Sequence, residues 1–151
     1  MTIGGAYNIY KGDHFGKIIS TGIPNMVFKN PYYLSKSDKK DRNIFIKYNM
    51  TLSYKLKLFT DMQIRNYSHN SDGSDNDRSV INFNSKNTFF NPKIGFNFKL
   101  NPKSNIYSSI AVANREPIRI DFLDSYEEPK HETLYDFEFG YNINYNFYTK
   151  I

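Results

Sequence analysis

Residues 90–100 read FNPKIGFNFKL, and residues 135–147 read YDFEFGYNINYNF. In both stretches nearly every second position holds an apolar or aromatic side chain, and the positions between hold Asn, Gly and charged residues. Successive side chains of a β-strand point to opposite faces of its sheet. Each stretch therefore predicts a strand with one apolar and one polar face, a period that does not fit a helix.

The same alternation predicts six strands along the chain. They comprise residues 2–10, 43–54, 57–67, 88–100, 105–114 and 134–147. Apolar residues alone define the faces, so the charged residues provide an independent check. All eight charged residues in these runs fall on polar faces, which chance would give roughly once in 256 trials: Lys47, Lys57, Asp61, Arg65, Lys93, Lys99, Asp136 and Glu138. We predict an all-β protein, an antiparallel up-and-down meander of about six long strands.

The predicted connections alternate in length. Residues 11–42, 68–87 and 115–133 form long connections, whereas residues 55–56 and 101–104 form tight turns, the second with good turn residues (NPKS). Membrane β-barrels have short turns at one end and longer loops at the other. The predicted strands also have about the length needed to cross a bilayer. The pattern therefore favours a fragment of a transmembrane β-barrel.

Aromatic residues fall near both ends of the predicted strands, where a membrane barrel carries its interfacial girdles. Those near the long connections are Tyr7, Phe90, Tyr135 and Phe137, and those near the tight turns are Tyr54, Phe98, Tyr145 and Phe147.

Composition limits the class of protein further. The chain of 151 residues has 13 Tyr and 13 Phe but no Trp and no Cys, and its aromatic content argues against disorder. Its mean hydropathy of −0.65 is compatible with a membrane sheet, because only alternate residues of such strands need be apolar. The net charge of +5 comes from scattered lysines without a basic stripe and interleaved aromatics, which argues against a nucleic-acid partner. Residues 1–6 lack the pattern of a signal peptide, which for a membrane barrel predicts a truncated chain.

Residue types that carry chemistry are dispersed. His14, His69 and His131 lie in three separate predicted connections, where solvated side chains are the simplest interpretation. The acidic run of residues 71–78 (SDGSDNDR) does not have the spacing of a calcium-binding EF-hand loop and predicts a solvated hairpin tip. We predict no enzyme activity, no metal site and no cofactor.

Arg115, Glu116 and Arg119 cluster where the fifth predicted strand ends. They are candidates for a patch that contacts or gates a ligand. The alternative, which we favour, is an ion-paired rim that orders the following loop. Asp136 and Glu138 are expected to pair with Arg115 or Lys93 inside the barrel and not to perform acid–base chemistry.

Three motifs carry a resemblance to a known family. They are residues 90–95 (FNPKIG), residues 111–117 (AVANREP) with Arg119, and residues 132–141 (ETLYDFEFGY). They resemble the barrel of TonB-dependent outer-membrane receptors, which carries an FNPK-type strand, an A-x-R-E-P-x-R strand end and an E-x-L-x-D-x-E-x-G-Y strand. Residues 2–7 (TIGGAY) and 12–16 (GDHFG) resemble a further strand and loop of the same barrels.

The resemblance implies that residues 1–151 are a partial barrel domain without plug or TonB box, located in the Gram-negative outer membrane. It implies active uptake of a scarce nutrient of the siderophore, haem, cobalamin or glycan class. The implied partners are outer-membrane lipid, the plug domain and remaining strands of the receptor, and the TonB energy-transducing complex. Two alternatives remain open: a small structural or adhesive outer-membrane β-protein, and a soluble carbohydrate-binding β-sandwich.

Overall fold

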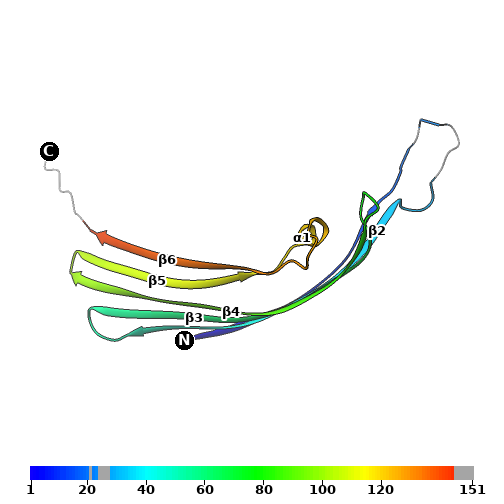
Figure 1. Ribbon diagram of the computed structural model, residues 1–151. Helices are drawn as coiled ribbons and strands as arrows, with labels where there is room; N and C mark the ends of the chain where they lie inside the picture. Colours follow the sequence, from blue (N-terminus) through cyan, green and yellow to red (C-terminus); the bar gives the residue numbers. More distant parts are fainter. Residues whose placement is uncertain (21, 24–27, 145–151) are drawn as a thin grey trace, which may run out of the picture.

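The computed structural model describes residues 1–20, 22–23 and 28–144. They form β1 (Thr2–Gly16), β2 (Tyr33–Thr51), β3 (Leu56–Ser74), β4 (Val80–Asn101), β5 (Ser104–Arg115), α1 (Arg119–Asp124) and β6 (Glu132–Ile143). The strands form one antiparallel sheet in the order β1-β2-β3-β4-β5-β6. The predicted all-β meander is confirmed, as one open sheet that does not close into a barrel (Figure 1).

Four strands are much longer than the sequence pattern predicts. β2 and β3 have 19 residues each and β4 has 22, so residues 33–42, 68–74 and 80–87 belong to strands and not to loops. β1 likewise continues through residues 11–16. These extensions are mostly polar, and their few apolar residues, such as Ile81 and Phe83, are too few to give a sustained alternation. The backbone ladder nevertheless continues through them without a register shift. Backbone hydrogen bonds do not require an apolar side chain, which is why the predicted boundaries are wrong here.

The connections change accordingly. The predicted long connection at residues 68–87 is wrong: residues 75–79 form a short hairpin closed by backbone bonds between Asp75 and Ser79 and between Arg78 and Asp75. The connection between β1 and β2 shrinks to residues 17–32. Tight turns are confirmed between β2 and β3 and between β4 and β5, with shifted bounds: the turn predicted at residues 55–56 comprises residues 52–55, and the turn predicted at residues 101–104 comprises residues 102–103. Residues 52–54 therefore belong to the turn and not to the preceding strand. Residues 145–147 of the predicted sixth strand, and with them Tyr145 and Phe147, lie outside the described residues.

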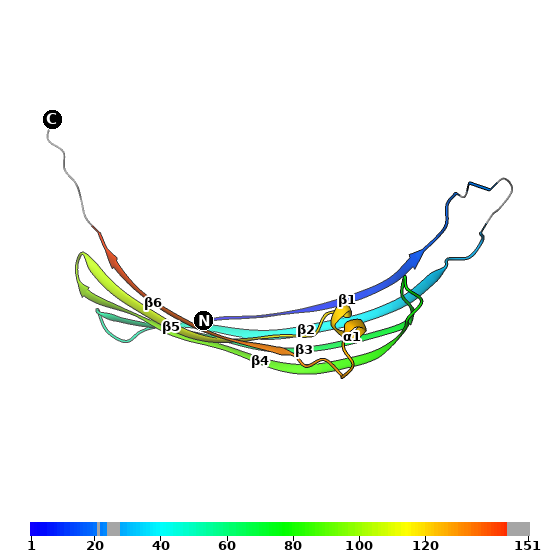
Figure 2. The same cartoon turned by 45° about the horizontal axis from the view of Figure 1, so that its top comes forward.

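The β5–β6 connection contains a helix that the sequence analysis does not predict. α1 has six residues, and Asp121 accepts a hydrogen bond from the Ile118 amide at its start. The sheet is curved along its strands, and α1 lies on the concave side (Figures 1 and 2). The described residues contain no helix long and apolar enough to cross a membrane.

A small packed core lies where the β5–β6 connection folds back over the concave face. Tyr67 and Ile81 are each 1% exposed and Phe89 is 4% exposed. The Tyr67 ring stacks on the Phe89 ring, and the Tyr67 hydroxyl and the Ser85 hydroxyl share a 2.7 Å hydrogen bond. Most other strand side chains are exposed or half-buried, because the sheet is a single layer.

Candidate functional site

The pairing register sorts the strand side chains into a convex and a concave face. Residues opposite each other on neighbouring strands share a face, so Ile46, Met62 and Pro92 form one row on the convex face. Arg65 and Phe83, which contact the β5–β6 connection, identify the concave face.

The convex face carries a continuous apolar band across all six strands. Phe137 and Phe139 at one side of it are each 73% exposed. Within the band, no side chain of the convex face in the described strands carries a charge. We define the apolar band as Ile3 and Tyr7 of β1; Ile44, Ile46, Tyr48 and Met50 of β2; Leu56, Leu58, Thr60, Met62 and Ile64 of β3; Phe90, Pro92, Ile94, Phe96, Phe98 and Leu100 of β4; Ile106, Ser108, Ile110 and Val112 of β5; and Tyr135, Phe137, Phe139, Tyr141 and Ile143 of β6.

The edge of the band is level across β2, β3 and β4, whereas on β1 Tyr7 and Ile9 continue the apolar side chains opposite Arg42 and Lys40. Ile44, Ile64 and Phe90 form the last apolar row of β2 to β4, and the next row holds Arg42, Asn66 and Thr88. Ten residues separate Phe90 from Leu100, or about 34 Å along the strand at about 3.4 Å per residue. The band is therefore a belt of defined height, a property that separate strand patterns do not reveal.

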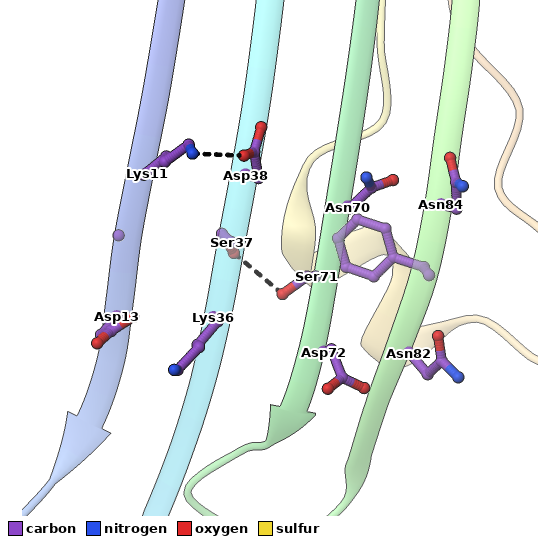
Figure 3. A pocket seen from close by; sticks show the side chains of 12 residues that line it. Lys11, Asp13, Lys36, Ser37, Asp38, Asn70, Ser71, Asp72, Asn82 and Asn84 are labelled. Atoms are coloured by element: carbon purple, nitrogen blue, oxygen red, sulfur yellow. Dashed lines mark hydrogen bonds and ion pairs between the residues drawn. The ribbon is translucent and has the colours of Figure 1, made fainter.

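Beyond the band the convex face becomes mostly polar on β2 to β4. Figure 3 shows two rows across β1 to β4: Lys11, Asp38, Asn70 and Asn84 in one, and Asp13, Lys36, Asp72 and Asn82 in the other. These residues line a shallow hollow of about 470 Å³. Lys11 and Asp38 form an exposed ion pair at 3.6 Å.

The concave face carries ion pairs where the convex face carries the band. Lys47 lies 3.1 Å from Asp61, and Lys93 lies 3.5 Å from Glu138. Glu138 also accepts a 2.8 Å hydrogen bond from Ser109. The register confirms the prediction that all eight strand charges share the polar face. The Lys93–Glu138 ion pair confirms the expected partner of Glu138. The expected pair of Arg115 with Asp136 or Glu138 is wrong, because Arg115 pairs with Glu132.

Aromatic rings of the concave face cover glycines on neighbouring strands. A Cβ added to Gly95 would meet the Phe59 ring, and one added to Gly140 would meet the Tyr107 ring. The glycine leaves room for the ring to lie flat against the neighbouring strand. These pairs give the polar face closely packed contacts between strands.

Glu116 is the centre of a charged network on the concave face. Its carboxylate accepts hydrogen bonds from Arg65 at 2.7 and 2.8 Å and from Lys39 at 2.7 Å. Arg65 also pairs with Asp41. Glu116 is 7% exposed. Burial acts to raise its pKa, but the hydrogen bonds from Arg65 and Lys39 outweigh burial and lower the pKa of Glu116 to about 2. The network therefore holds a charged carboxylate under the β5–β6 connection at neutral pH.

Two further residues, Arg119 and Phe122, hold this connection against the sheet. The Phe122 ring stacks on the Phe83 ring, with centroids 4.0 Å apart. Arg119 pairs with Asp75 of the β3–β4 hairpin at 3.0 Å and donates to Ser35 at 3.4 Å. The bond from Arg119, helped by the Asn76 amide, lowers the pKa of Asp75. Glu116, Arg119 and Phe122 thus attach one connection to three strands and a hairpin.

The three candidate residues do not converge on one site. Arg115 pairs with Glu132 across β5 and β6 at 3.4 Å, while Glu116 binds β2 and β3 and Arg119 binds the hairpin. These contacts match the ion-paired alternative, in which the residues order the following connection. The sequence analysis does not identify Lys39 and Asp41 as members of this network, because they fall in residues 11–42, which the pattern predicts to be a loop. The alternation places Arg65 on the polar face, but its partner Glu116 is 51 residues away in the chain, a pairing that no local pattern reveals.

The three histidines lie on different elements, and the acidic run of residues 71–78 comprises the end of β3 and most of the β3–β4 hairpin. His14 is on β1, His69 is on β3 against Phe83, and His131 lies against Phe89. Burial, assisted by the nearby Lys39, lowers the pKa of His69. The described residues contain no group of three or more His, Cys, Asp or Glu side chains that could hold a metal ion.

Comparison with known proteins finds no family model, no curated protein and no solved structure that matches this chain.

Proposed function

We propose that this chain forms part of the wall of an outer-membrane β-barrel, with the convex face in lipid and the concave face towards the lumen. The apolar band is the observation that carries this proposal. At a strand tilt of about 40°, its length along β4 corresponds to a height of about 26 Å, close to the apolar belt of about 25 Å on known membrane barrels. A soluble sheet would expose the same face to water, at a high cost in hydration.

The concave face supports the same proposal. A barrel lumen is polar, and this face carries the Lys47–Asp61 and Lys93–Glu138 pairs at the height of the band. The β5–β6 connection folds onto this face and would lie inside the barrel. The open edges of β1 and β6 need further strands or a partner, since unpaired backbone groups are not stable in hydrocarbon.

Within this class we propose the barrel of an active transporter for a scarce nutrient. The support is the resemblance of residues 90–95, 111–117 and 132–141 to TonB-dependent receptors. Glu116 and Arg119 of these motifs hold the connection onto the concave face. A connection anchored in the lumen suits a protein that controls passage through its barrel.

Membrane insertion can be tested with single tryptophans, because the chain has none. Phe96 and Asn97 are neighbours on β4 that point to opposite faces. In vesicles containing brominated phosphatidylcholine, Phe96→Trp should be strongly quenched and Asn97→Trp weakly quenched. Equal quenching of the two would overturn the lipid-facing assignment, and a monomer soluble without detergent would favour the carbohydrate-binding sandwich.

Transport can be tested separately by gene deletion. The deletion strain should grow poorly on one limiting nutrient among ferric siderophore, haem, cobalamin and glycan, and should grow normally on the others. A gene carrying Asn97→Arg should restore growth, whereas Phe96→Arg should not. Unchanged growth on all four would favour the structural or adhesive alternative.

A further inference from the structure

Three cations lie on the convex face directly beyond the apolar band. Arg42 is in the first polar row, level with Asn66 of β3. Lys40 and Lys86 are in the second row, on either side of Ser68. We call Lys40, Arg42 and Lys86 the basic cluster.

Negative charges occur on this face only from the third row onward. Asp13, Asp38 and Asp72 lie in the third and fourth rows, together with Lys11 and Lys36. Two residues along a strand span about 7 Å, so the first two rows cover about 14 Å beyond the band. Within the described strands every charge on the convex face in that interval is positive.

The basic cluster is free to bind an anion. All three side chains are exposed. Arg42 donates from Nε to Asn66 at 3.1 Å, and both its terminal nitrogens are without a partner in the described residues. The ammonium groups of Lys40 and Lys86 likewise have no ion pair there. Like charges that are close together and unpaired are unfavourable unless an anion neutralises them.

We propose that the basic cluster binds phosphate groups of anionic lipids whose acyl chains cover the apolar band. The proposal rests on the proposed function, since it requires lipid against the band. Lipid phosphates lie just beyond the hydrocarbon region, at the level of Arg42 and Lys40. Arginine binds phosphate with two parallel hydrogen bonds, and lysines near an anionic membrane surface add electrostatic attraction. Free phosphate is a poorer match, because this open surface has no group that encloses a small ion.

The experiment uses Phe90→Trp as a reporter, because Phe90 is in the row of the band next to Arg42 and Thr88. The full chain is reconstituted into phosphatidylcholine vesicles that contain either dibrominated phosphatidylglycerol or dibrominated phosphatidylcholine. Quenching gives the relative association constant of the two lipids at this position. We expect a preference of about fivefold for phosphatidylglycerol, the factor that one basic contact at a membrane surface provides.

Two variants with equal loss of charge are compared in this background. Lys40→Ser/Arg42→Ser/Lys86→Ser should reduce the preference to about one. Lys17→Ser/Lys29→Ser/Lys36→Ser removes three cations farther from the band and should keep it. If the first variant keeps the preference, or both lose it equally, the proposal is overturned. It is also overturned if excess inorganic phosphate abolishes the preference, since the cluster would then be a site for the free anion.

A separate reporter distinguishes this failure from failure of the proposed function. Phe96→Trp, in the middle of the band, should be quenched by dibrominated phosphatidylcholine with the basic cluster present or removed. Loss of that quenching in the parent protein would contradict the membrane proposal itself. Quenching at Phe96 without lipid preference at Phe90 would contradict only the lipid-phosphate proposal.

Discussion

Glu116, just beyond the end of β5, binds Arg65 of β3 with both carboxylate oxygens, at 2.7 and 2.8 Å from the two terminal guanidinium nitrogens. The contact joins the end of β5 to β3 across the intervening strand β4. It fixes the start of the β5–β6 connection on the concave face. Bidentate carboxylate–guanidinium pairs are geometrically specific as well as strong. This relationship decides where the connection lies.

Glu116→Gln should destabilise the folded sheet by about 2 kcal/mol, the usual scale for losing hydrogen bonds to a charged partner. Because Arg65 keeps its ion pair with Asp41, the loss of stability should be smaller than that caused by leaving a buried charge without any partner. Urea unfolding in detergent measures the difference. Glu127→Gln is the control, since Glu127 is an exposed carboxylate of the same connection and should be nearly neutral. Equal effects of the two variants would contradict the assigned role.

Stability should also depend on pH through Glu116. Its folded pKa of about 2 lies below the ordinary value of 4.5, so its contribution is complete above pH 4.5 and is lost as the pH falls toward 2. The difference in unfolding free energy between the parent and Glu116→Gln should therefore shrink over that interval. A difference that stays constant from pH 6 to about pH 2 would exclude this linkage.

Phe96→Arg should cost roughly 2–4 kcal/mol in a bilayer, because a charge near the middle of the lipid-facing surface is desolvated. Asn97→Arg should be nearly neutral, since Asn97 lies on the concave face beside a polar hollow. Unfolding of the refolded protein in lipid vesicles gives both values. Similar penalties for the two variants would show that the faces are wrongly assigned.

Gly95→Ala should cost about 1–3 kcal/mol, the usual range for overpacking, because the added methyl group meets the Phe59 ring. Gly22→Ala is the control, since no atom lies within 4 Å of the Cβ it would add. Phe59→Leu should relieve part of the penalty in a double-mutant cycle. Additive effects of Gly95→Ala and Phe59→Leu would show that ring and glycine do not interact.

Orientation can be read from cysteine labelling, since the chain has no cysteine. On whole cells, Ser125→Cys or Asn76→Cys should react with a membrane-impermeant maleimide, because loops carry recognition on the outer side in the proposed topology. Lys103→Cys, in the tight turn between β4 and β5, should react only after the outer membrane is permeabilised. The reverse order of labelling would invert the topology.

The two faces and the tight turns could be predicted from sequence because their causes are local. A strand places alternate residues on opposite faces whatever lies around it, so Phe96 and Asn97 separate without knowledge of the register. The turn after Asn101 is specified by its own residues, since the Asn101 side chain accepts a hydrogen bond from the Lys103 amide. The fold class follows from these two features.

Only the tertiary structure decided the strand lengths, the level edge of the apolar band and the position of the β5–β6 connection. Ser37 and Ser71 share a 3.0 Å hydrogen bond across β2 and β3, but serine on a polar strand gives no apolar signal that would extend the prediction to it. Glu116 and Arg65 are 51 residues apart and meet because the register brings their strands to the same height. Alternation is a property of one strand, whereas register and the folding of a connection over a face depend on several strands at once.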